Sequence, residues 1–558
     1  MTRRFVLAAP ALSAGACASL GRSALYEAAR PMGNSVFAHG VASGDPAVDS
    51  VILWTRASPR GDEGLDVVWE VATDEGFVSI VQAGAARATA ARDWTVKAEA
   101  AGLLPGQDYF YRFRAAGAVS PIGRTRTLPM GAVESLRFAV VSCANHALGY
   151  FNVYDHIARG AFDAVLHLGD YIYEYGPGGY DGAAELPDRA HEPAHETVTL
   201  ADYRARHAQY KRDASLQAMH AAHPVIAIWD DHEAANDSWA EGGENHQPEE
   251  GAWGARRAAA LQAYEEWMPV RPFAGAARFA HAAYGDLATL VVLETRLHAR
   301  DRAISFNDLA ALATQADAVA FLRDVVGADQ RGMLGAEQLT HVRGVLEGTR
   351  RPWMLIANQT LMAQVKTPDV APYLTPETEA ALRERWSEAE GFLRASRFGL
   401  PLSLDSWDGY PAERERLYAA ARAAGVGDLL VLTGDTHTWW ANDLTCADGA
   451  PIGVELGAAS VTSPSPLSEE MAGSRATSLG LLVNRENPAV RYVSGRSHGY
   501  LDLTLGREAG RATFVAVDTI MQRRYRVFRE ASFRLVKQDG RLRMKGPRGL
   551  SLFERFLF

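Results

Sequence analysis

The stretch FDAVLHLGDYIYEYG, residues 162–176, decides the fold, because a continuously apolar run passes there directly into a polar loop. Its apolar residues do not alternate with polar ones, as expected of a strand that is buried on both faces of an α/β sheet. Asp170 and Tyr173 follow at the point where this strand should end. Since ligands bind at the carboxyl ends of strands in open α/β sheets, the stretch predicts a functional site at that edge.

Three further segments repeat this layout far away in the chain. They are FAVVSC (138–143), PVIAIWDDHEAAN (224–236) and DLLVLTGDTHTWW (428–440). Each one joins a strand-like apolar run to side chains with oxygen, sulfur or nitrogen donors. Because strand ends converge at one edge, the sequence predicts a dinuclear metal site built from all four segments. Its donors are Cys143, Asp170, Tyr173, Asp231, Asn236, Asp435 and His437.

Taken one at a time, these donors have ordinary structural explanations. Asp170 and Asp435 could cap turns after strands, and His437 could be a hydrogen-bonded polar side chain. Cys143 could be an inert buried residue, or it could form a disulfide with Cys446. Their joint occurrence at four strand ends favours metal binding, and it favours a ligand over a disulfide for the cysteine.

The composition defines the class of protein. A chain of 558 residues, 47% of them apolar, can form more than one domain with a large α/β core. A net charge of -10, together with the lack of an evident Lys/Arg run, argues against a nucleic-acid partner. No internal apolar stretch reaches the roughly 20 residues of a membrane span, so we expect no transmembrane anchor.

Residues 1–30 are interpreted as an export signal. The paired arginines Arg3 and Arg4 precede a short apolar stretch and small residues, a layout similar to a twin-arginine signal. It predicts a periplasmic or secreted protein. The alternatives are a disordered basic N-terminus and a lipoprotein acylation site at Cys17, although Ala14 stands where such sites usually carry Leu.

Residues 33–130 are predicted to form a small β-sandwich. Short alternating strands such as VILWTR (51–56), LDVVWEVAT (65–73) and YFYRFRA (109–115) are separated by Gly, Pro and Asp turns. The segment LLPGQDYFYRF resembles a strand entry of fibronectin type III domains, with Tyr109 as the hydroxyl donor of a tyrosine corner. We assign this domain no chemistry.

Residues 136–530 are predicted to form the catalytic domain, with helices near 200–213 and 251–267. Two insertions, 176–198 and 300–335, could cover the site as lids. His191 and His195, in the first insertion, are expected to be solvated and not to bind metal. Residues 531–558 are interpreted as an extension whose apolar end, LSLFERFLF, forms a terminal amphipathic helix.

A family resemblance rests on motifs that occur in order along the whole chain. With these motifs the chain resembles the PhoD-type alkaline phosphatases, which are calcineurin-like metallophosphoesterases. The resemblance implies a four-layer α/β/β/α sandwich behind an N-terminal immunoglobulin-like or fibronectin-like domain, with mixed sheets instead of a doubly wound parallel one. The motifs are FAHGVASGDP (37–46), SC (142–143), HLGDYIYEYG (167–176), LADYRARHAQY (200–210), AIWDDHEAAND (227–237), AYEEWMPVR (263–271), LETR (293–296) and TGDTHTWW (433–440).

The resemblance also implies cofactors, one Fe³⁺ with one or two Ca²⁺. Cys143, Tyr173 and His437 offer the thiolate, phenolate and imidazole that suit a Lewis-acidic transition metal. Asp170 comes from the same segment as Tyr173, and its two carboxylate oxygens suit a bridge between ions. Most calcineurin-like phosphoesterases open with an Asp-x-His strand end where this chain has Cys143, which puts the usual two-zinc or two-manganese site in doubt.

The calcium side of the predicted site uses hard oxygen ligands. Asp231, Asn236 and Asp435 are donors of the kind that Ca²⁺ accepts in flexible number. In the LETR motif, Glu294 stands where the family pattern leads us to expect Asp. Arg296 in the same motif could contact the substrate, or it could form a buried structural ion pair.

The predicted reaction is hydrolysis of phosphate esters by a metal-bound hydroxide that attacks phosphorus in line. Asp170, Asn236 and His437 are the predicted catalytic residues. Asn358 and Gln359, which follow the strand-like WMLIA run, could line the substrate pocket together with Arg296, or they could cap a turn or helix.

The substrate class is open between monoesters and diesters of small molecules, lipids or nucleotides. Tyr171, Trp239, Trp439 and Trp440 could shape a substrate groove, although core packing explains such residues equally well. Two alternative functions are a catalytically silent exported binding protein and a redox role for a thiolate-bound and phenolate-bound iron.

Overall fold

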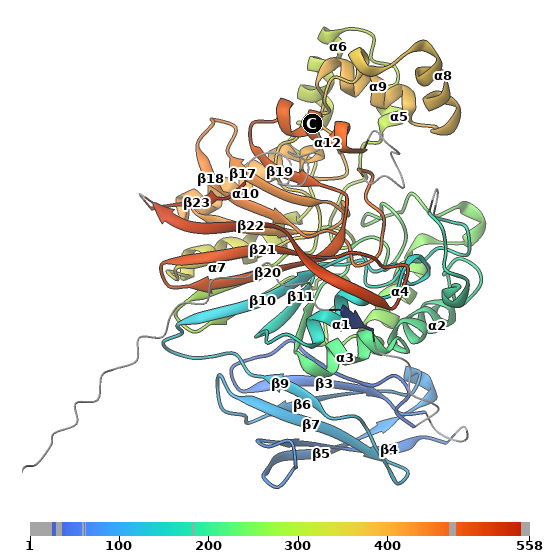
Figure 1. Ribbon diagram of the computed structural model, residues 1–558, viewed down its shortest axis with the longest axis vertical. Helices are drawn as coiled ribbons and strands as arrows, with labels where there is room; N and C mark the ends of the chain where they lie inside the picture. Colours follow the sequence, from blue (N-terminus) through green and yellow to red (C-terminus); the bar gives the residue numbers. More distant parts are fainter. Residues whose placement is uncertain are drawn as a thin grey trace, which may run out of the picture.

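The computed structural model describes residues 25–28, 36–58, 61, 63–180, 183–467, 476–538 and 540–547 (Figure 1). Most of the predicted leader, with Cys17, and the predicted terminal helix at 550–558 lie outside the described residues. Strand β1 (Leu25–Glu27) pairs with β22 (Arg524–Gln538) of the main sheet. The predicted leader boundary at residue 30 therefore differs from the structure, since a strand of the folded body lies before it.

The larger sheet contains the first three strands whose ends were predicted to form the site. Strands β10, β11 and β12 are parallel neighbours, whereas β20 to β23 continue the sheet on one side as antiparallel strands. The continuous apolar sequences of β10, β11 and β12 fit burial on both faces, as predicted, whereas β21 to β23 alternate between buried and exposed residues. The bounds are β10 (Ser135–Val141), β11 (Ala164–His167), β12 (Val225–Ala227), β20 (His498–Gly506), β21 (Ala509–Val517) and β23 (Arg541–Lys545).

A second sheet of seven strands carries the fourth strand end. It is also mixed, because β14, β15, β16 and β18 are parallel whereas β13, β17 and β19 run antiparallel to their neighbours. Its strands are β13 (Ala280–Tyr284), β14 (Ala288–Val292), β15 (Trp353–Ala357), β16 (Leu429–Thr433), β17 (Trp439–Thr445), β18 (Pro451–Gly457) and β19 (Val490–Ser494).

The two sheets pack face to face, with helices outside them (Figure 1). One buried apolar cluster joins strands of both sheets, for example Leu503 of β20 and Leu432 of β16. Helices α1 (Asn152–Ala158), α3 (Ala214–Ala222) and α4 (Trp253–Trp267) contribute to the same cluster. A second cluster joins the other face of the seven-stranded sheet to α7 (Gly335–Gly348) and α10 (Pro411–Ala423).

The predicted helices at 200–213 and 251–267 are α2 (Leu200–Lys211) and α4. The predicted domain boundary at residue 530 falls inside β22, and the sheet continues to the end of β23, so the catalytic sheet extends further than expected. Within the described ranges, none of the helices combines the length and apolar character needed to cross a bilayer.

The N-terminal strands form two sheets around their own apolar cluster. Gly44, at the end of β2, pairs with Val225, so one of these sheets continues the larger sheet. The Tyr109 hydroxyl accepts a hydrogen bond of 2.8 Å from the Leu104 amide, so it is an acceptor and not the predicted donor. The strands are β2 (Val41–Gly44), β3 (Ser50–Arg56) and β6 (Thr95–Ala101) against β4 (Leu65–Ala72), β5 (Ile80–Ala88), β7 (Asp108–Ala115), β8 (Ala118–Val119) and β9 (Gly123–Arg126).

A helical insertion forms a separate small body at one end of the molecule (Figure 1). It has its own apolar cluster, which includes Leu309, Ala318, Ala395 and Leu404. The insertion predicted at 300–335 therefore forms only part of this body, because the core also includes Ala395 and Leu404, which follow β15 of the main body. Its helices are α5 (Phe306–Leu309), α6 (Gln315–Phe321), α8 (Pro376–Arg385) and α9 (Ala389–Phe398), and α12 (Ala476–Glu486) lies nearby in Figure 1.

Candidate metal centre

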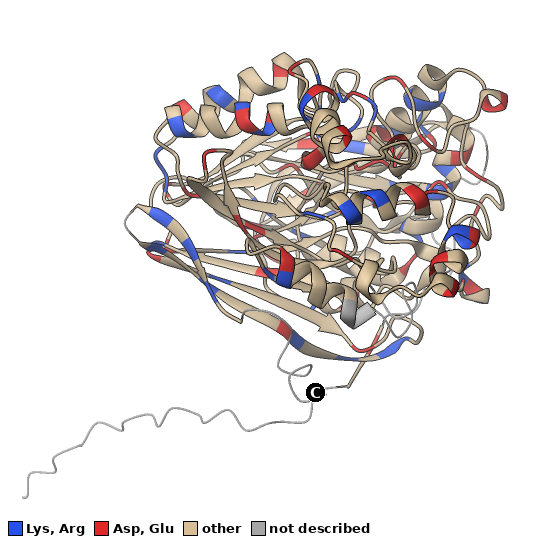
Figure 2. Cartoon of the chain, turned by 90° about the horizontal axis from the view of Figure 1, so that it is seen from above, with Lys and Arg blue, Asp and Glu red and all other residues tan. Residues whose placement is uncertain are grey.

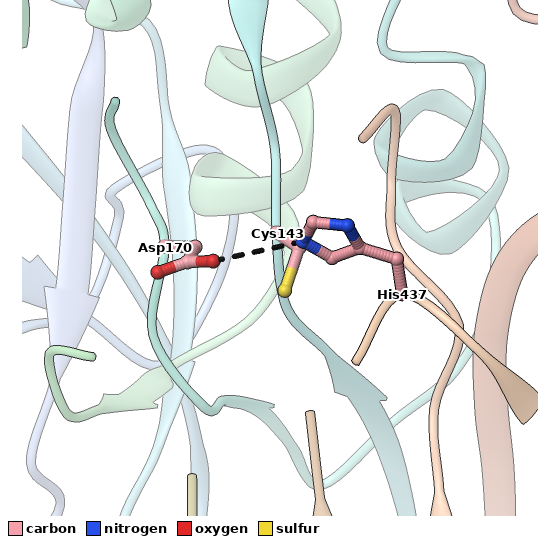
Figure 3. A group of neighbouring side chains, drawn as sticks. All are labelled: Cys143, Asp170 and His437. Carbon is pink, nitrogen blue, oxygen red and sulfur yellow. Dashed lines mark ion pairs between the residues drawn. The ribbon is translucent and has the colours of Figure 1, made fainter. Parts of the chain in front are cut away.

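The four predicted strand ends meet at one place. Cys143 follows β10, Asp170 follows β11, and His437 follows β16 of the other sheet. One ligand atom from each of these three buried residues lies within 4.8 Å of the others (Figure 3). The dashed line in Figure 3 joins the His437 imidazole to the Asp170 carboxylate at 3.9 Å. The two sheets therefore build this group together.

The backbone at these strand ends is strained. Cys143, Asp170, Asp435 and His437 have φ angles of 62°, 54°, 61° and 53°. This left-handed region is uncommon for residues with a side chain, and such residues cluster at functional sites because the surrounding fold holds them there. The strand ends thus turn sharply at the very residues predicted to bind metal.

Two glycines allow the strand ends to approach one another. A Cβ on Gly169 would lie 2.4 Å from the Cβ of Asp230, and one on Gly434 would lie 2.5 Å from the Ser142 hydroxyl oxygen. Contacts this short are not tolerated, so only glycine fits at these positions. The Gly-Asp pairs of the sequence therefore serve close packing as well as the placement of each carboxylate.

Tyr173 joins the first group. Its hydroxyl donates to Asp170 Oδ2 at 3.0 Å, accepts from the Ser463 hydroxyl at 2.6 Å, and lies 3.2 Å from His437 Nε2. Burial and the Asp170 carboxylate raise the pKa of Tyr173 and of Cys143 well above their usual values. Both groups therefore stay protonated unless a cation replaces their protons, which is how metals bind thiolates.

Three carboxylates form a second group beside the first. Atoms of Asp230, Asp231 and Asp435 lie within 4.8 Å of one another, and Asp231 also forms a group of this size with Asp170 and His232. Asp231 and Asp170 thus connect the two groups. Burial, with added repulsion from nearby carboxylates, raises the pKa of Asp230 and of Asp435.

Arg296 is fully buried among these acids. Its guanidinium lies 2.9 Å from Asp435, 2.7 Å from Asp405 and 3.6 Å from Asp231, and it also donates to Asp230. Of the two roles considered for this residue, the geometry favours the buried ion pair over a substrate contact. Arg300 also pairs with Asp405, so two guanidiniums face four carboxylates, and the site has room for further positive charge.

The residues present fit metal ions. Asp170 Oδ1, Asp230 Oδ2 and Asp231 Oδ1 are buried, and within the described part of the chain they have no hydrogen-bond partner. Buried polar atoms are nearly always hydrogen-bonded, so these carboxylate oxygens without hydrogen-bond partners call for a cation. The mixed donors around Asp170 suit a transition metal, and the all-carboxylate group suits a hard cation such as Ca²⁺.

Asn236 lies at the edge of this site. Its backbone N–H donates to Glu174 at 2.7 Å, and its side-chain amide donates to Glu244 at 3.1 Å. Because the amide nitrogen is engaged by Glu244, the amide oxygen is the atom left to serve as a ligand. The side chain is only partly buried, so it could meet an incoming substrate as well.

Sequence reasoning missed His232. Its Nδ1 lies 2.8 Å from the buried Glu174 carboxylate, and its ring stacks on Tyr173 with centroids 4.1 Å apart. Burial alone would lower its pKa, but Glu174 and the nearby aspartates outweigh burial and raise the pKa of His232 well above 6.5. The signal was available, since His232 directly follows Asp231 in the same motif.

Glu233 was also missed. Its buried carboxylate accepts from the backbone N–H groups of Asp170 at 3.0 Å, Tyr171 at 2.6 Å and Asp230 at 2.8 Å. It therefore fixes the loop after β11 to the loop after β12. Sequence reasoning had no way to find this contact, because the three amides come from two segments that only the fold brings together.

The insertion at 176–198 reaches the site. The Tyr180 hydroxyl lies 3.3 Å from His437 Nδ1, and its ring packs edge-on against Tyr173. His195 is exposed, as predicted, and lies 3.1 Å from Asp202. His191 was wrongly predicted to be solvated, because it is 2% exposed and packed inside the protein.

Asn358, Gln359 and Glu294 have structural roles. Asn358 accepts from the Trp407 indole at 3.0 Å, and Gln359 donates to the Leu293 carbonyl at 2.8 Å. Both are fully buried, so the proposed lining of a substrate pocket is not what their side chains do. Glu294 accepts hydrogen bonds from a tryptophan and from backbone amides of its own turn, which explains its presence without a metal.

Most of the remaining aromatic candidates are buried in the core. Tyr171, Trp439 and Trp440 are at most 2% exposed, and only Trp239 is partly accessible. Cys143 and Cys446 are both free and buried, which excludes the disulfide that was considered between them. Cys446 belongs to the apolar cluster on the outer face of the seven-stranded sheet.

Comparison with known families identifies relatives over nearly the whole chain. Residues 138–514 match the family described as PhoD-like phosphatase, and residues 22–129 match the PhoD-like phosphatase N-terminal domain. The second match begins before the predicted start of the sandwich at residue 33.

Two individual proteins are similar to this chain over most of its length. Alkaline phosphatase D of Bacillus subtilis (strain 168) is 35% identical over 533 residues, which cover 91% of this chain and 82% of the relative. A solved structure of PhoD is similar with a TM-score of 0.76 and 32% identity, and the match covers 93% of this chain and 94% of that one.

Proposed function

This chain belongs to the PhoD-like phosphatase family and is a phosphoesterase, and from that premise we propose an exported, metal-dependent enzyme that hydrolyses phosphate esters with water. The observation that carries the metal dependence is the convergence of orphaned carboxylate oxygens with a thiol, a phenol and an imidazole at four strand ends. This combination is costly for a buried site without cations.

The proposed ions are one Fe³⁺ and one or two Ca²⁺. Cys143, Tyr173 and His437 would hold the iron, with Asp170 shared between ions. Calcium would be held by Asp231, Asn236 and Asp435, because their donors are hard oxygens. When bound, the ions supply Lewis-acid chemistry, since they lower the pKa of water to give hydroxide and offset charge on the phosphate.

The protein groups divide the remaining tasks. Asp170 holds the two halves of the site together, and Asn236 can orient a phosphate oxygen from its partly exposed position. His437 is placed beside Asp170 by its strained turn. His232, whose Nδ1 lies 2.8 Å from Glu174, stands beside Asp170 and Asp231 and can donate a hydrogen bond to a phosphate oxygen. Water is then the nucleophile as hydroxide, and no phosphorylated residue is needed.

Export and the layered fold complete the proposal. Export to the periplasm or medium is inferred from Arg3 and Arg4, which lie outside the described residues. The two packed sheets with helices outside them support a four-layer α/β/β/α arrangement, and the Tyr109 corner supports a fibronectin-like N-terminal domain.

The test is hydrolysis of mono- and bis-(p-nitrophenyl) phosphate at alkaline pH, together with the metal content of protein purified without chelator. We expect iron in the protein, loss of activity on calcium chelation and recovery on its return. The ratio of the two rates separates a monoesterase from a diesterase.

Other outcomes would redirect the proposal. Activity that survives chelation, in protein free of iron, would refute the mixed iron and calcium site. The intact and convergent donor set argues against a catalytically silent binding protein. Iron-loaded protein that hydrolyses neither substrate would instead favour a redox role, which requires an absorption change on reduction.

A further inference from the structure

An exposed row of cations crosses the end of the larger sheet. Arg511 of β21 lies directly opposite Arg534 of β22, and Arg534 lies opposite Lys545 of β23. All three side chains are exposed. Neighbouring strands are about 4.8 Å apart, so three positive charges stand side by side on one face.

Strand β23 extends this row into a two-dimensional patch. Arg541 and Arg543 precede Lys545 at two-residue spacing and are also exposed, so all three lie on the same side of the strand. The residues between them, Leu542 and Met544, are buried in the core that joins the two sheets. The basic face is defined here as Arg511, Arg534, Arg541, Arg543 and Lys545.

The charges of the basic face are not balanced by partners. Within the described residues, none of the five has an ion pair. Thr504 is the β20 residue in the row of Arg511, and Asp502, two residues before it on β20, is held by Arg137 at 2.7 Å. Like charges directly opposite one another in a sheet are destabilising. Figure 2 shows Lys and Arg recurring along the strands of this sheet, although the chain as a whole has a net charge of -10.

This patch corrects the expectation from sequence that no basic stripe exists. The cations alternate with buried apolar residues along each strand, so no run of Lys and Arg is visible in the sequence. Only the pairing of β21, β22 and β23 brings the charges onto one surface.

We propose that the basic face docks the protein on an anionic phospholipid bilayer. The five cations are exposed on three hydrogen-bonded strands, so they are spread over an area and can contact several phosphate groups at once. Val536 of β22 lies directly opposite Arg543 of β23 and is partly exposed. It adds apolar area to the basic face. Binding of a nucleic-acid strand would instead favour a groove with stacking aromatic side chains.

The test is flotation of the full-length protein with vesicles of phosphatidylcholine and phosphatidylglycerol in equal parts, at low and at high salt. We expect binding at low salt, no binding to pure phosphatidylcholine vesicles, and release at high salt. Each cation near an anionic bilayer contributes about 1 kcal/mol, equivalent to about fivefold in affinity, so R511Q/R534Q/K545Q should bind about a hundredfold more weakly.

The matched control is R343Q/R385Q/R397Q, which removes the same charge from exposed arginines on α7, α8 and α9. It should bind nearly as well as the parent protein. Hydrolysis of soluble p-nitrophenyl phosphate by both triple variants should be unchanged, which shows that they are folded. Equal weakening by both variants would overturn the proposal, because net charge would then explain the binding. Binding of a soluble oligonucleotide that depends on the basic face, without vesicle binding, would also overturn it.

Discussion

The metal centre and the basic face differ in how their charges are placed, because those of the metal centre are buried and paired whereas those of the basic face are exposed and unpaired. At the strand ends, four aspartates surround Arg296, whose side chain is fully buried, whereas the five cations of the basic face are exposed. Buried charges must be paired or bind ions, because leaving water costs several kcal/mol for each ion. Exposed charges keep their water, so the same sheet can carry unpaired cations at low cost.

The largest effect is expected from Asp170→Asn. The change removes a charge from the residue that connects the first donor group to Asp231 of the second, and hydrolysis should fall more than about 100-fold, because even residues that only orient ligands are worth about 10- to 100-fold. Iron and calcium content should fall in the same protein. Full activity with normal metal content would show that Asp170 does not hold the two groups together.

The next effect is expected from Arg296→Gln in protein stripped of metal. Asp230, Asp231 and Asp435 would lose their buried cation, which should lower the free energy of unfolding by about 3–5 kcal/mol. Urea denaturation measures the loss, and added Ca²⁺ should recover part of it. Arg343→Gln on the surface is the control and should change stability little. An equal change in both variants would contradict the contrast drawn above.

Acid should destabilise the interior but not the basic face. Burial and, to a smaller extent, nearby cations lower the pKa of His39, His167, His191 and His207 from 6.5 to about 3. The unfolded chain therefore binds more protons than the folded one between these values, so stability is present above pH 6.5 and is lost as pH falls toward 3. Thermal unfolding across this range should show it, and His191→Gln should flatten the slope. A melting temperature independent of pH would refute these shifts.

A smaller effect is expected from Glu233→Gln. Three backbone N–H groups donate to the two carboxylate oxygens of Glu233, and the amide of glutamine offers only one acceptor oxygen. The free energy of unfolding should therefore fall by about 1–3 kcal/mol. Activity should fall about 10- to 100-fold with a lower affinity for metal. If metal titration shows unchanged affinity while stability falls, Glu233 supports the fold alone and does not position the ligands.

The smallest effect is expected from Arg534→Gln. Removing the central charge of the row relieves repulsion from Arg511 and Lys545, so unfolding should require slightly more free energy, within about 0.5 kcal/mol. The gain should disappear at high salt because the charges are exposed. Chemical denaturation at two salt concentrations measures it, and a loss of stability would mean that this arginine has an unrecognised partner.

Much of the site was predictable from sequence because strand ends carry a strong local signal. Continuous apolar runs identified β10, β11, β12 and β16, and the donors directly after them lie together in the structure. The same local logic failed for Asn358 and Gln359, which also follow a strand. Their side chains are buried in hydrogen bonds with Trp407, Thr295 and Leu293, partners that no local pattern indicates.

By itself, the sequence determined which residues can be strands, which polar groups follow them, and the family to which the chain belongs. These features depend on neighbouring residues along the chain. Only the tertiary structure decided that Arg296 lies among aspartates, that Glu233 joins two loops, and that alternating arginines gather on one face. Those outcomes depend on pairing between distant strands. Burial and strand register decide which charged side chains lie next to each other, and local spacing along the chain does not.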